Sequence, residues 1–379
     1  MCEDMLIGLL RDQGINLAVS LPDDKAKELF RLLPGSFETI ELLREEDGVG
    51  VCAGAYLAGR NPAMVIQSSG LGNMLNALLS LSRTYELPLP VIASWRGVYK
   101  ETIPAQVPFN AALPGILKAA DIPYVIVHHP HEFDRVSEII ETAFRCHTPA
   151  VALVSPQCWE GNPSCEREEE IADRSRQISL VHERNVPSPS MTRLDAIRAI
   201  VPHLKDAAVV SNIGVPSKEL FWTADRKENF YMLGSYTQAS SVGLGIALST
   251  RRRTMVIDGD GSLLGTAILP VIAAKKPRNL TIICLDNGVF GSTGNQMTPA
   301  YRQVDLELYA RACGFVQTIK VTSAEETGGA ITSLALEQGP SFIHVVIQPG
   351  NSDVPNIPLT PHEIRDRFMN TIRNDAIQG

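Results

Sequence analysis

The chain has 379 residues, a length typical of two domains, and its 44% apolar and 20% charged residues are those of an ordinary globular protein. The formal charge of −8 argues against a partner held mainly by electrostatics, such as a nucleic acid or an anionic membrane. No apolar run approaches the ~18 residues of a membrane-spanning helix and the N-terminus lacks a secretory signal, so we expect a cytoplasmic protein.

Short β-branched runs alternate with helix-length segments in both halves. Strands are expected at 17–21, 38–43, 63–68, 89–94, 123–127 and 150–154, then at 207–211, 254–258, 280–285 and 341–347. Helices are expected in the second half at 192–203, 239–250, 262–275 and 323–337. This rhythm predicts an α/β fold with two domains, each a parallel sheet with helices on both faces. The domains are predicted at 1–157 and 192–379, joined by a polar linker at 158–191.

An acidic run, Glu45-Glu46-Asp47, opens the helix expected after the strand at 38–43. Acidic residues are common in the first turn of a helix because they complement its dipole. Taken alone, the run is therefore more typical of helix capping than of catalysis.

A glycine-rich turn, Gly259-Asp260-Gly261-Ser262, follows the strand expected at 254–258. Its glycines let the backbone approach a ligand closely, and the helix after it offers unpaired N–H groups to phosphate oxygens. Taken singly, an ordinary tight turn is the more common explanation. The chain has no P-loop, and no G-x-G-x-x-G motif opens a helix after a first strand, which disfavours a nucleotide-binding oxidoreductase.

A second polar turn, Asp286-Asn287-Gly288-Val289, follows the strand at 280–285. From residue 260 to residue 287 is 27 residues, about one helix plus one strand, so the two strand ends can be neighbours. Mg²⁺ prefers oxygen ligands and is usually held by one or two protein oxygens together with phosphates. Asp260, the Asn287 side chain and the Val289 carbonyl supply such a set.

These two turns resemble the metal-diphosphate motif of thiamine-diphosphate enzymes. The resemblance implies thiamine diphosphate and Mg²⁺ as cofactors, with Asp260, Asn287 and Val289 as metal ligands. It also implies that residues 1–157 form a pyrimidine-binding domain and residues 192–379 a diphosphate-binding domain.

The helix that starts in the acidic run, with Ala53-Gly54-Ala55-Tyr56 further along, resembles the glutamate-led helix of that pyrimidine-binding domain. Counting nine residues back from Gly54 places the family's catalytic glutamate at Glu45. Such a carboxylate, bonded to the cofactor's pyrimidine ring, promotes the tautomer that removes the thiazolium proton. Counting from Tyr56 instead favours Glu46, and Asp47 is the third candidate.

The runs at 45–59, 67–73, 103–108 and 212–220 are similar to the sulfopyruvate decarboxylase family. The resemblance spans residues 1–157 and 192–370. In that family the two halves are often separate subunits, whereas in this chain they are fused. It implies a carboxy-lyase that converts 3-sulfopyruvate to sulfoacetaldehyde and CO₂, as in coenzyme M biosynthesis. One alternative is a phosphonopyruvate decarboxylase, which usually carries Gln-His where this chain has Ala105-Gln106. Another is a catalytically silent regulatory subunit.

Further contacts follow from the same resemblance. Relatives tend to show Gly-Ser-Met-Gly where this chain has Gly234-Ser235-Tyr236, which implies that Tyr236 lies under the thiazolium; an ordinary half-buried aromatic is the alternative. Asn73 would orient the cofactor or cap a helix.

The implied substrate, a small 2-oxo acid with an anionic 3-substituent, needs cationic and amide donors. The candidates are Arg96, Lys100, Gln106 and Lys218, although a solvent-facing role is at least as common for each. Because family enzymes build the site between chains, we expect a homodimer or homotetramer in which Glu45 and Asp260 of one site belong to different chains.

Overall fold

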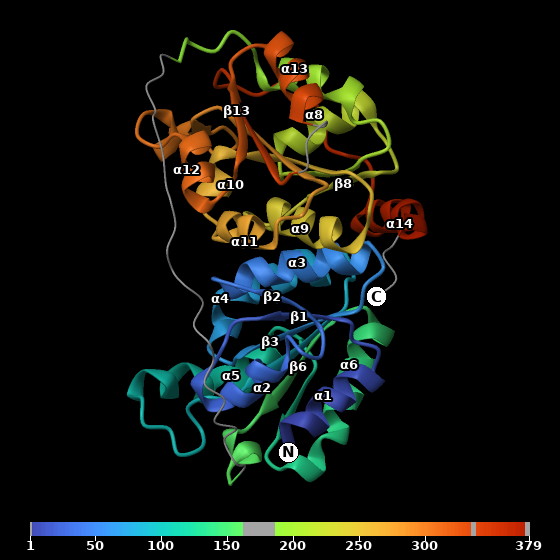
Figure 1. Cartoon of the computed structure of the whole chain (residues 1–379), viewed down its shortest axis with the longest axis vertical. Coiled ribbons are helices and arrows are strands. Elements are labelled where there is room, and N and C mark those ends of the chain that lie inside the picture. The colour runs from blue at the N-terminus through green and yellow to red at the C-terminus, as the bar shows by residue number, and fades with distance from the viewer. Residues whose placement is uncertain (1, 162–185, 335–338, 376–379) are drawn as a thin grey trace.

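The computed structural model describes residues 2–161, 186–334 and 339–375. Each half of the chain forms one six-stranded sheet, and the two sheets are stacked with helices between them (Figure 1). Most of the predicted linker, residues 162–185, lies outside the described residues. No helix in the described part of the chain is long and apolar enough to cross a membrane.

The sheet of the first half is parallel throughout, in the order β2-β1-β3-β4-β6-β5. Its four central strands are buried almost throughout, as helices covering both faces of a parallel sheet require, whereas the edge strands β2 and β5 are more exposed. They are β1 (Leu17–Ser20), β2 (Glu38–Glu41), β3 (Pro62–Gln67), β4 (Leu89–Ser94), β5 (Tyr124–Val127) and β6 (Pro149–Val154). All six predicted strands of this half are confirmed.

The main sheet of the second half is also parallel and has the order β13-β14-β10-β9-β7-β8. Numbered from its own first strand, this is the same order as in the first half, so the two halves share one topology. Its strands are β7 (Ala208–Ser211), β8 (Asn229–Tyr231), β9 (Thr254–Gly259), β10 (Leu280–Asp286), β13 (Gln317–Val321) and β14 (Ser341–Val346). The predicted α/β class is confirmed, and the edge strands β8 and β13 were not predicted.

Helices cover both sheets, and a small antiparallel pair, β11 (Val289–Phe290) with β12 (Gln296–Met297), follows β10. The first half contributes α1 (Cys2–Asp12), α2 (Lys27–Leu32), α3 (Glu45–Leu57), α4 (Gly70–Ala77), α5 (Val107–Ala119) and α6 (Asp134–Cys146). The second contributes α7 (Arg193–Ile200), α8 (Val215–Ala224), α9 (Ala239–Ser249), α10 (Asp260–Leu264), α11 (Ile268–Lys275), α12 (Leu306–Cys313), α13 (Ala324–Leu334) and α14 (Pro361–Ile372).

The two halves meet along α3 and α9, which lie side by side between the sheets (Figure 1). Both helices are buried on nearly every side, and one apolar core runs through them from sheet to sheet. Glycines set their separation. A Cβ on Gly54 would lie 2.0 Å from the Val242 carbonyl oxygen, and one on Gly245 would lie 2.0 Å from the Val51 carbonyl oxygen. Any side chain at these positions would force the helices apart.

The single helix predicted at 262–275 is wrong, because α10 ends at Leu264 and α11 begins at Ile268. The interruption lies where Asp47 of α3 reaches across from the first half. Its carboxylate accepts hydrogen bonds from the Thr266 hydroxyl (2.5 Å) and the Ala267 N–H (3.0 Å). Asp47 thus caps α11 from the other half of the chain, and burial raises the pKa of this carboxyl to about 6.

Candidate active site

A cleft opens at the carboxyl edge of the second sheet, where ligands bind in folds of this kind. Every described residue that lines it comes from the second half of the chain. They are Arg193, Asn212, Ile213, Val215, Pro216, Tyr236, Gly259, Asp260, Gly261, Ser262, Leu285, Asn287, Val289, Phe290, Gly291, Ser292 and Asn351. The cleft therefore brings together the two polar turns that the sequence placed at neighbouring strand ends.

Asp260 begins α10 and is 3% exposed, and Thr298 donates its hydroxyl to this carboxylate. The Asn287 side-chain oxygen accepts the Val289 N–H at 3.2 Å, which folds that turn tightly. The adjacent Asp286 accepts the Gly288 N–H at 2.9 Å and contacts His344 Nε2 at 2.7 Å. The predicted oxygen ligands thus lie in two turns, after β9 and after β10, that hydrogen bonds hold in place.

The charge of this cleft suits a cation. Burial, aided by the nearby Asp286 carboxylate, raises the pKa of Asp260 to about 7, and the hydrogen bond from Thr298 offsets only part of this. No group of three or more His, Cys, Asp or Glu side chains able to hold a metal is found among the described residues. A carboxylate, an amide and a carbonyl oxygen need further oxygens to complete an octahedron, and phosphate would supply them.

The walls of the cleft also suit a diphosphate. A Cβ on Gly261 would lie 2.5 Å from the Phe290 ring, so this turn has no room for a side chain. The Tyr236 hydroxyl donates to the Gly261 carbonyl at 2.6 Å, which places the ring against the turn. In the neighbouring turn, the buried Ser235 hydroxyl has no hydrogen-bond partner in the described part of the chain. The helix expected to offer N–H groups to phosphate is α10. It has only five residues and is shorter than predicted.

The three carboxylates at the start of α3 have different surroundings. Glu46 forms an ion pair with Arg44 (2.7 Å), and Asp47 is bound to the second half as described above. Glu45 is 4% exposed and accepts a hydrogen bond from Asn73 Nδ2 (3.0 Å). A Cβ on Gly70 would lie 2.5 Å from its carboxylate. Of the three, only Glu45 is buried without a cation or an interdomain hydrogen bond among the described residues.

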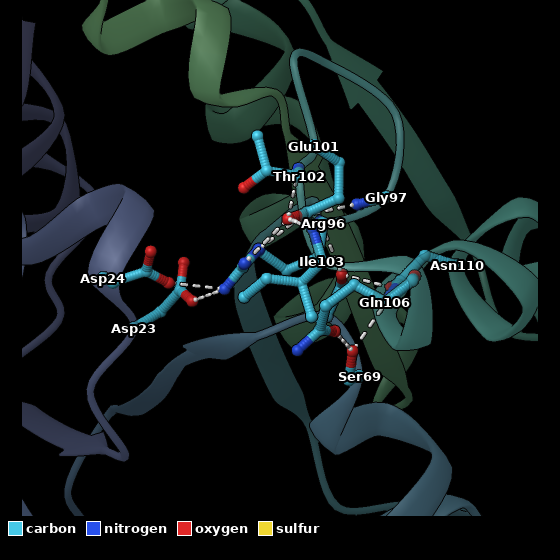
Figure 2. Close-up of polar contacts among 11 residues, drawn as sticks. Asp23, Asp24, Ser69, Arg96, Gly97, Glu101, Thr102, Ile103, Gln106 and Asn110 are labelled. Atoms are coloured by element: carbon cyan, nitrogen blue, oxygen red, sulfur yellow. Dashed lines mark hydrogen bonds and ion pairs between the residues drawn. The ribbon is translucent and has the colours of Figure 1, made fainter.

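Gln106 lies beside the turn before α4, next to Gly70, because its side-chain oxygen accepts a hydrogen bond from the Ser69 hydroxyl at 2.5 Å (Figure 2). Glu45, Asn73 and Gln106 therefore gather around residues 69–73, where β3 leads into α4. None of these three lines the cleft of the second half. Within one chain the predicted residues form two separate groups, one in each half.

Arg96, which was predicted to bind substrate, is paired with protein carboxylates in the structure. It is 2% exposed, and its guanidinium contacts Asp23 (2.6 Å), Asp24 (2.6 Å) and Glu101 (2.9 Å) (Figure 2). The hydrogen bonds from Arg96 lower the pKa of Glu101 to about 2. Three protein carboxylates therefore surround the Arg96 guanidinium. These ion pairs join the loop after β1 to the loop after β4.

The two predicted lysines lie away from the cleft lining. Lys100 is exposed and contacts Glu160 and Tyr99. Lys218 is half-buried on α8, whose first residues, Val215 and Pro216, line the cleft.

Sequence reasoning missed four charged residues near the strand ends: Asp23, Arg193, Asp286 in its role with His344, and Asp47 as an interdomain cap. A partial signal existed for Asp23, since Leu21-Pro-Asp23-Asp24 follows a predicted strand. Arg193 comes directly after the predicted linker, but its burial depends on Glu219 and Asn351, which are far away in the sequence.

Two family models match the chain. The thiamine pyrophosphate enzyme N-terminal TPP binding domain matches residues 2–129, and the C-terminal TPP binding domain matches residues 215–345. The chain is 46% identical to a sulfopyruvate decarboxylase from Methanosarcina acetivorans, covering 98% of this chain and 97% of the relative. It is 35% identical to a phosphonopyruvate decarboxylase from Streptomyces viridochromogenes, covering 87% and 84%.

The halves also match separate proteins from Methanococcus maripaludis. Sulfopyruvate decarboxylase subunit beta is 42% identical over 48% of this chain and 98% of the subunit, and subunit alpha is 36% identical over 39% and 91%. This chain therefore corresponds to a fusion of two such subunits. Among solved structures, a putative thiamin diphosphate-dependent enzyme from Mycobacterium smegmatis superimposes with a TM-score of 0.70 at 14% identity, covering 92% of this chain and 99% of that one, which shows a shared fold.

Proposed function

Because this chain belongs to the thiamine pyrophosphate enzyme family, in the group that includes sulfopyruvate decarboxylase, we propose that it decarboxylates 3-sulfopyruvate to sulfoacetaldehyde and CO₂. The reaction breaks the bond between the carboxylate and the keto carbon, and that carbon takes up one proton. The proposal includes a cytoplasmic location and a place in coenzyme M biosynthesis. The observation that carries it is the pairing of the Asp260 and Asn287 turns in one cleft, together with a full-length relative of that activity.

We assign the cleft of the second half to the diphosphate and Mg²⁺. Asp260, the Asn287 side chain and the Val289 carbonyl would hold the metal. The turns that contain Gly259, Gly261 and Ser262, and those of Gly234, Ser235 and Tyr236, would surround the rest of the cofactor. When bound, thiamine diphosphate supplies a cationic ring that accepts the electron pair released with CO₂.

Glu45 would act on the other end of the cofactor. A buried carboxylate facing a pyrimidine nitrogen would hold a proton there and so favour the ring's imino tautomer, whose nitrogen can act as a base. Asn73 fixes one carboxylate oxygen of Glu45, and the tight contact with Gly70 limits its movement. This leaves the carboxylate oriented before any ligand arrives.

Separation of the two groups within one chain supports a site shared between two chains. Exposed apolar side chains flank both groups, as a surface covered by a second copy would require. They are Leu43, Val98, Ile103 and Val107 in the first half and Tyr236, Phe290, Met297 and Tyr301 in the second. We therefore propose at least a homodimer, with Glu45 of one protomer completing the cleft of its partner.

The substrate's sulfonate would meet donors from both groups. With Arg96 committed to three carboxylates, Lys100, Gln106 and Lys218 remain the candidates. Phosphonopyruvate is the second candidate substrate, favoured by the 35% identical relative. A silent regulatory role is opposed by the presence of both Glu45 and the oxygen ligands in one chain.

The test uses the purified full chain with thiamine diphosphate and Mg²⁺. Incubation with sulfopyruvate should release equal amounts of sulfoacetaldehyde and CO₂, and EDTA should stop the reaction until Mg²⁺ is restored. Sulfopyruvate and phosphonopyruvate compete in the same assay, and the larger kcat/KM identifies the substrate. Release of CO₂ from neither compound would reject the proposal.

A further inference from the structure

We infer that Arg193, a residue with no role in the arrangement above, binds the terminal phosphate of the diphosphate ligand in the second-half cleft. The inference rests on the proposed function, because the cleft must take a diphosphate. Arg193 is a buried cation that lines the cleft, and it is 6% exposed. A guanidinium is placed in such a position only when its hydrogen bonds and charge are matched.

The backbone of Arg193 is fixed by the start of α7. Thr192 accepts the Asp195 N–H through its hydroxyl, and the Asp195 carboxylate accepts the Thr192 N–H in return. This capping box sets the first helical turn, of which Arg193 is the first residue. The side chain therefore extends from a rigid point.

Two of the three guanidinium nitrogens are occupied. Nε donates to Glu219 Oε2 (2.8 Å), and Nη2 donates to Asn351 Oδ1 (2.8 Å) and to Glu219 Oε1 (3.4 Å). Glu219 is 1% exposed and also accepts the Ser352 N–H, so the carboxylate is held on both sides. For Nη1, no hydrogen-bond acceptor is recorded among the residues the structure describes, which leaves two N–H donors for a ligand in the cleft.

The surroundings indicate which part of a ligand these donors would meet. Asn351, which is bound to Arg193, donates through Nδ2 to the Gly291 carbonyl (2.7 Å), two residues beyond Val289. Arg193 thus stands next to the turn proposed to hold the metal. Tyr236, 42% exposed, marks the open side, whereas Arg193 belongs to the buried wall. A ligand that enters with its phosphates first would bring its terminal phosphate to Arg193.

The test measures cofactor binding by calorimetry in Mg²⁺, with thiamine diphosphate and thiamine monophosphate as probes. Arg193→Gln alone would leave Glu219 buried and unpaired, so the variant is the double substitution Arg193→Gln/Glu219→Gln. The matched control is Glu219→Gln, which loses the ion pair but keeps the guanidinium. Thermal unfolding of each apoprotein reports whether the fold is intact.

For the double variant we expect the Kd of the diphosphate to rise about 10- to 100-fold and that of the monophosphate by less than about threefold. The control should bind the diphosphate as tightly as the wild type or more tightly. Equal losses in the control and the double variant, or unchanged binding in the double variant, would overturn the inference alone. A wild-type chain that binds no thiamine diphosphate would overturn the proposed function and this inference with it.

Discussion

At the carboxyl edge of the second sheet the loops leave a cleft lined by Asp260 and Asn287, whereas at the same edge of the first sheet ion pairs join the loops. In the second half, Asp260 is buried near the Asp286 carboxylate, and its pKa rises. In the first half, Arg96 is equally buried but is surrounded by three carboxylates. The two edges belong to sheets of identical strand order.

This contrast shows that the fold does not determine the chemistry of either half. A repeated topology supplies two equivalent edges, and their loop residues differ. Under the proposed function, one edge would hold the diphosphate and the other would present Glu45, so neither half alone would form a complete site. The packing of α3 against α9 joins the two halves. Substitutions in the cleft, at Glu45 and in the packing between the halves should therefore have different effects.

The largest effect should come from removing one key residue in each half. Asp260→Ala should abolish measurable activity and Mg²⁺-dependent cofactor binding, because the metal loses its only proposed carboxylate. Glu45→Ala should lower kcat by about 10²- to 10⁴-fold, since it removes proton-transfer catalysis, while cofactor affinity changes little. Steady-state kinetics and calorimetry distinguish the two. Loss of cofactor binding in both variants would contradict the division of roles.

The next effect concerns the packing between the halves. Gly54→Ala should lower the free energy of unfolding by about 3 kcal/mol or more, because its Cβ meets the Val242 carbonyl oxygen at 2.0 Å. The matched control is Gly8→Ala on α1, where a Cβ meets nothing within 4 Å. The control should gain up to about 1 kcal/mol from helix propensity. Urea unfolding of both variants checks this, and equal stabilities would show that the helices tolerate separation.

Asp47 gives a smaller, pH-dependent effect. Because its folded-state pKa lies near 6 and the ordinary value is 3.8, the folded protein binds this proton more tightly. The contribution of Asp47 to stability is therefore greatest at low pH and falls as pH rises towards 6. Asp47→Asn removes the titration, so between pH 5 and pH 7 its stability relative to wild type should rise by about 1 kcal/mol.

The companion variant Asp47→Ala removes the acceptor altogether. The part-buried Ala267 N–H would then lose this acceptor, and we expect this variant to be about 1 to 3 kcal/mol less stable than Asp47→Asn at pH 7. Urea unfolding at the two pH values measures both differences. A pH-independent difference between wild type and Asp47→Asn would argue that Asp47 keeps an ordinary pKa.

The smallest effect should come from Tyr236→Phe. The hydroxyl donates to the Gly261 carbonyl at 2.6 Å, but the residue is 42% exposed, so the loss of this bond should weaken cofactor binding by less than about tenfold. Tyr236→Ala also removes the ring and should weaken binding further. If the two variants bind the cofactor equally, the ring contributes nothing beyond its hydroxyl.

Local patterns predicted ten of the strands in the two main sheets, because most of them are buried runs of apolar residues. They did not predict β8, which has three residues, or β13, where Gln317, Thr318 and Lys320 dilute the apolar signal. The break between α10 and α11 depends on Asp47, more than 200 residues earlier in the chain. No periodicity within 262–275 contains that information.

Local sequence patterns predicted the candidate site only in part, for the same reason. The glycine and acidic turns at 259–262 and 286–289 were visible because their strand contexts repeat. The commitment of Arg96 to Asp23, and the burial of Arg193 against Glu219, arise from pairings across 73 and 26 residues. Sequence spacing identified the residues that touch a strand end, but it could not show which charges were already neutralised by protein partners.

The most direct test of the shared site mixes two inactive chains. Differently tagged Glu45→Ala and Asp260→Ala chains are expressed together, and hybrids are isolated through both tags. In a twofold dimer with sites between chains, one site of each hybrid has both residues intact, so about half of the wild-type activity should return. Sites contained within single chains would leave every site of the hybrid defective, and purified hybrids without activity would contradict the account.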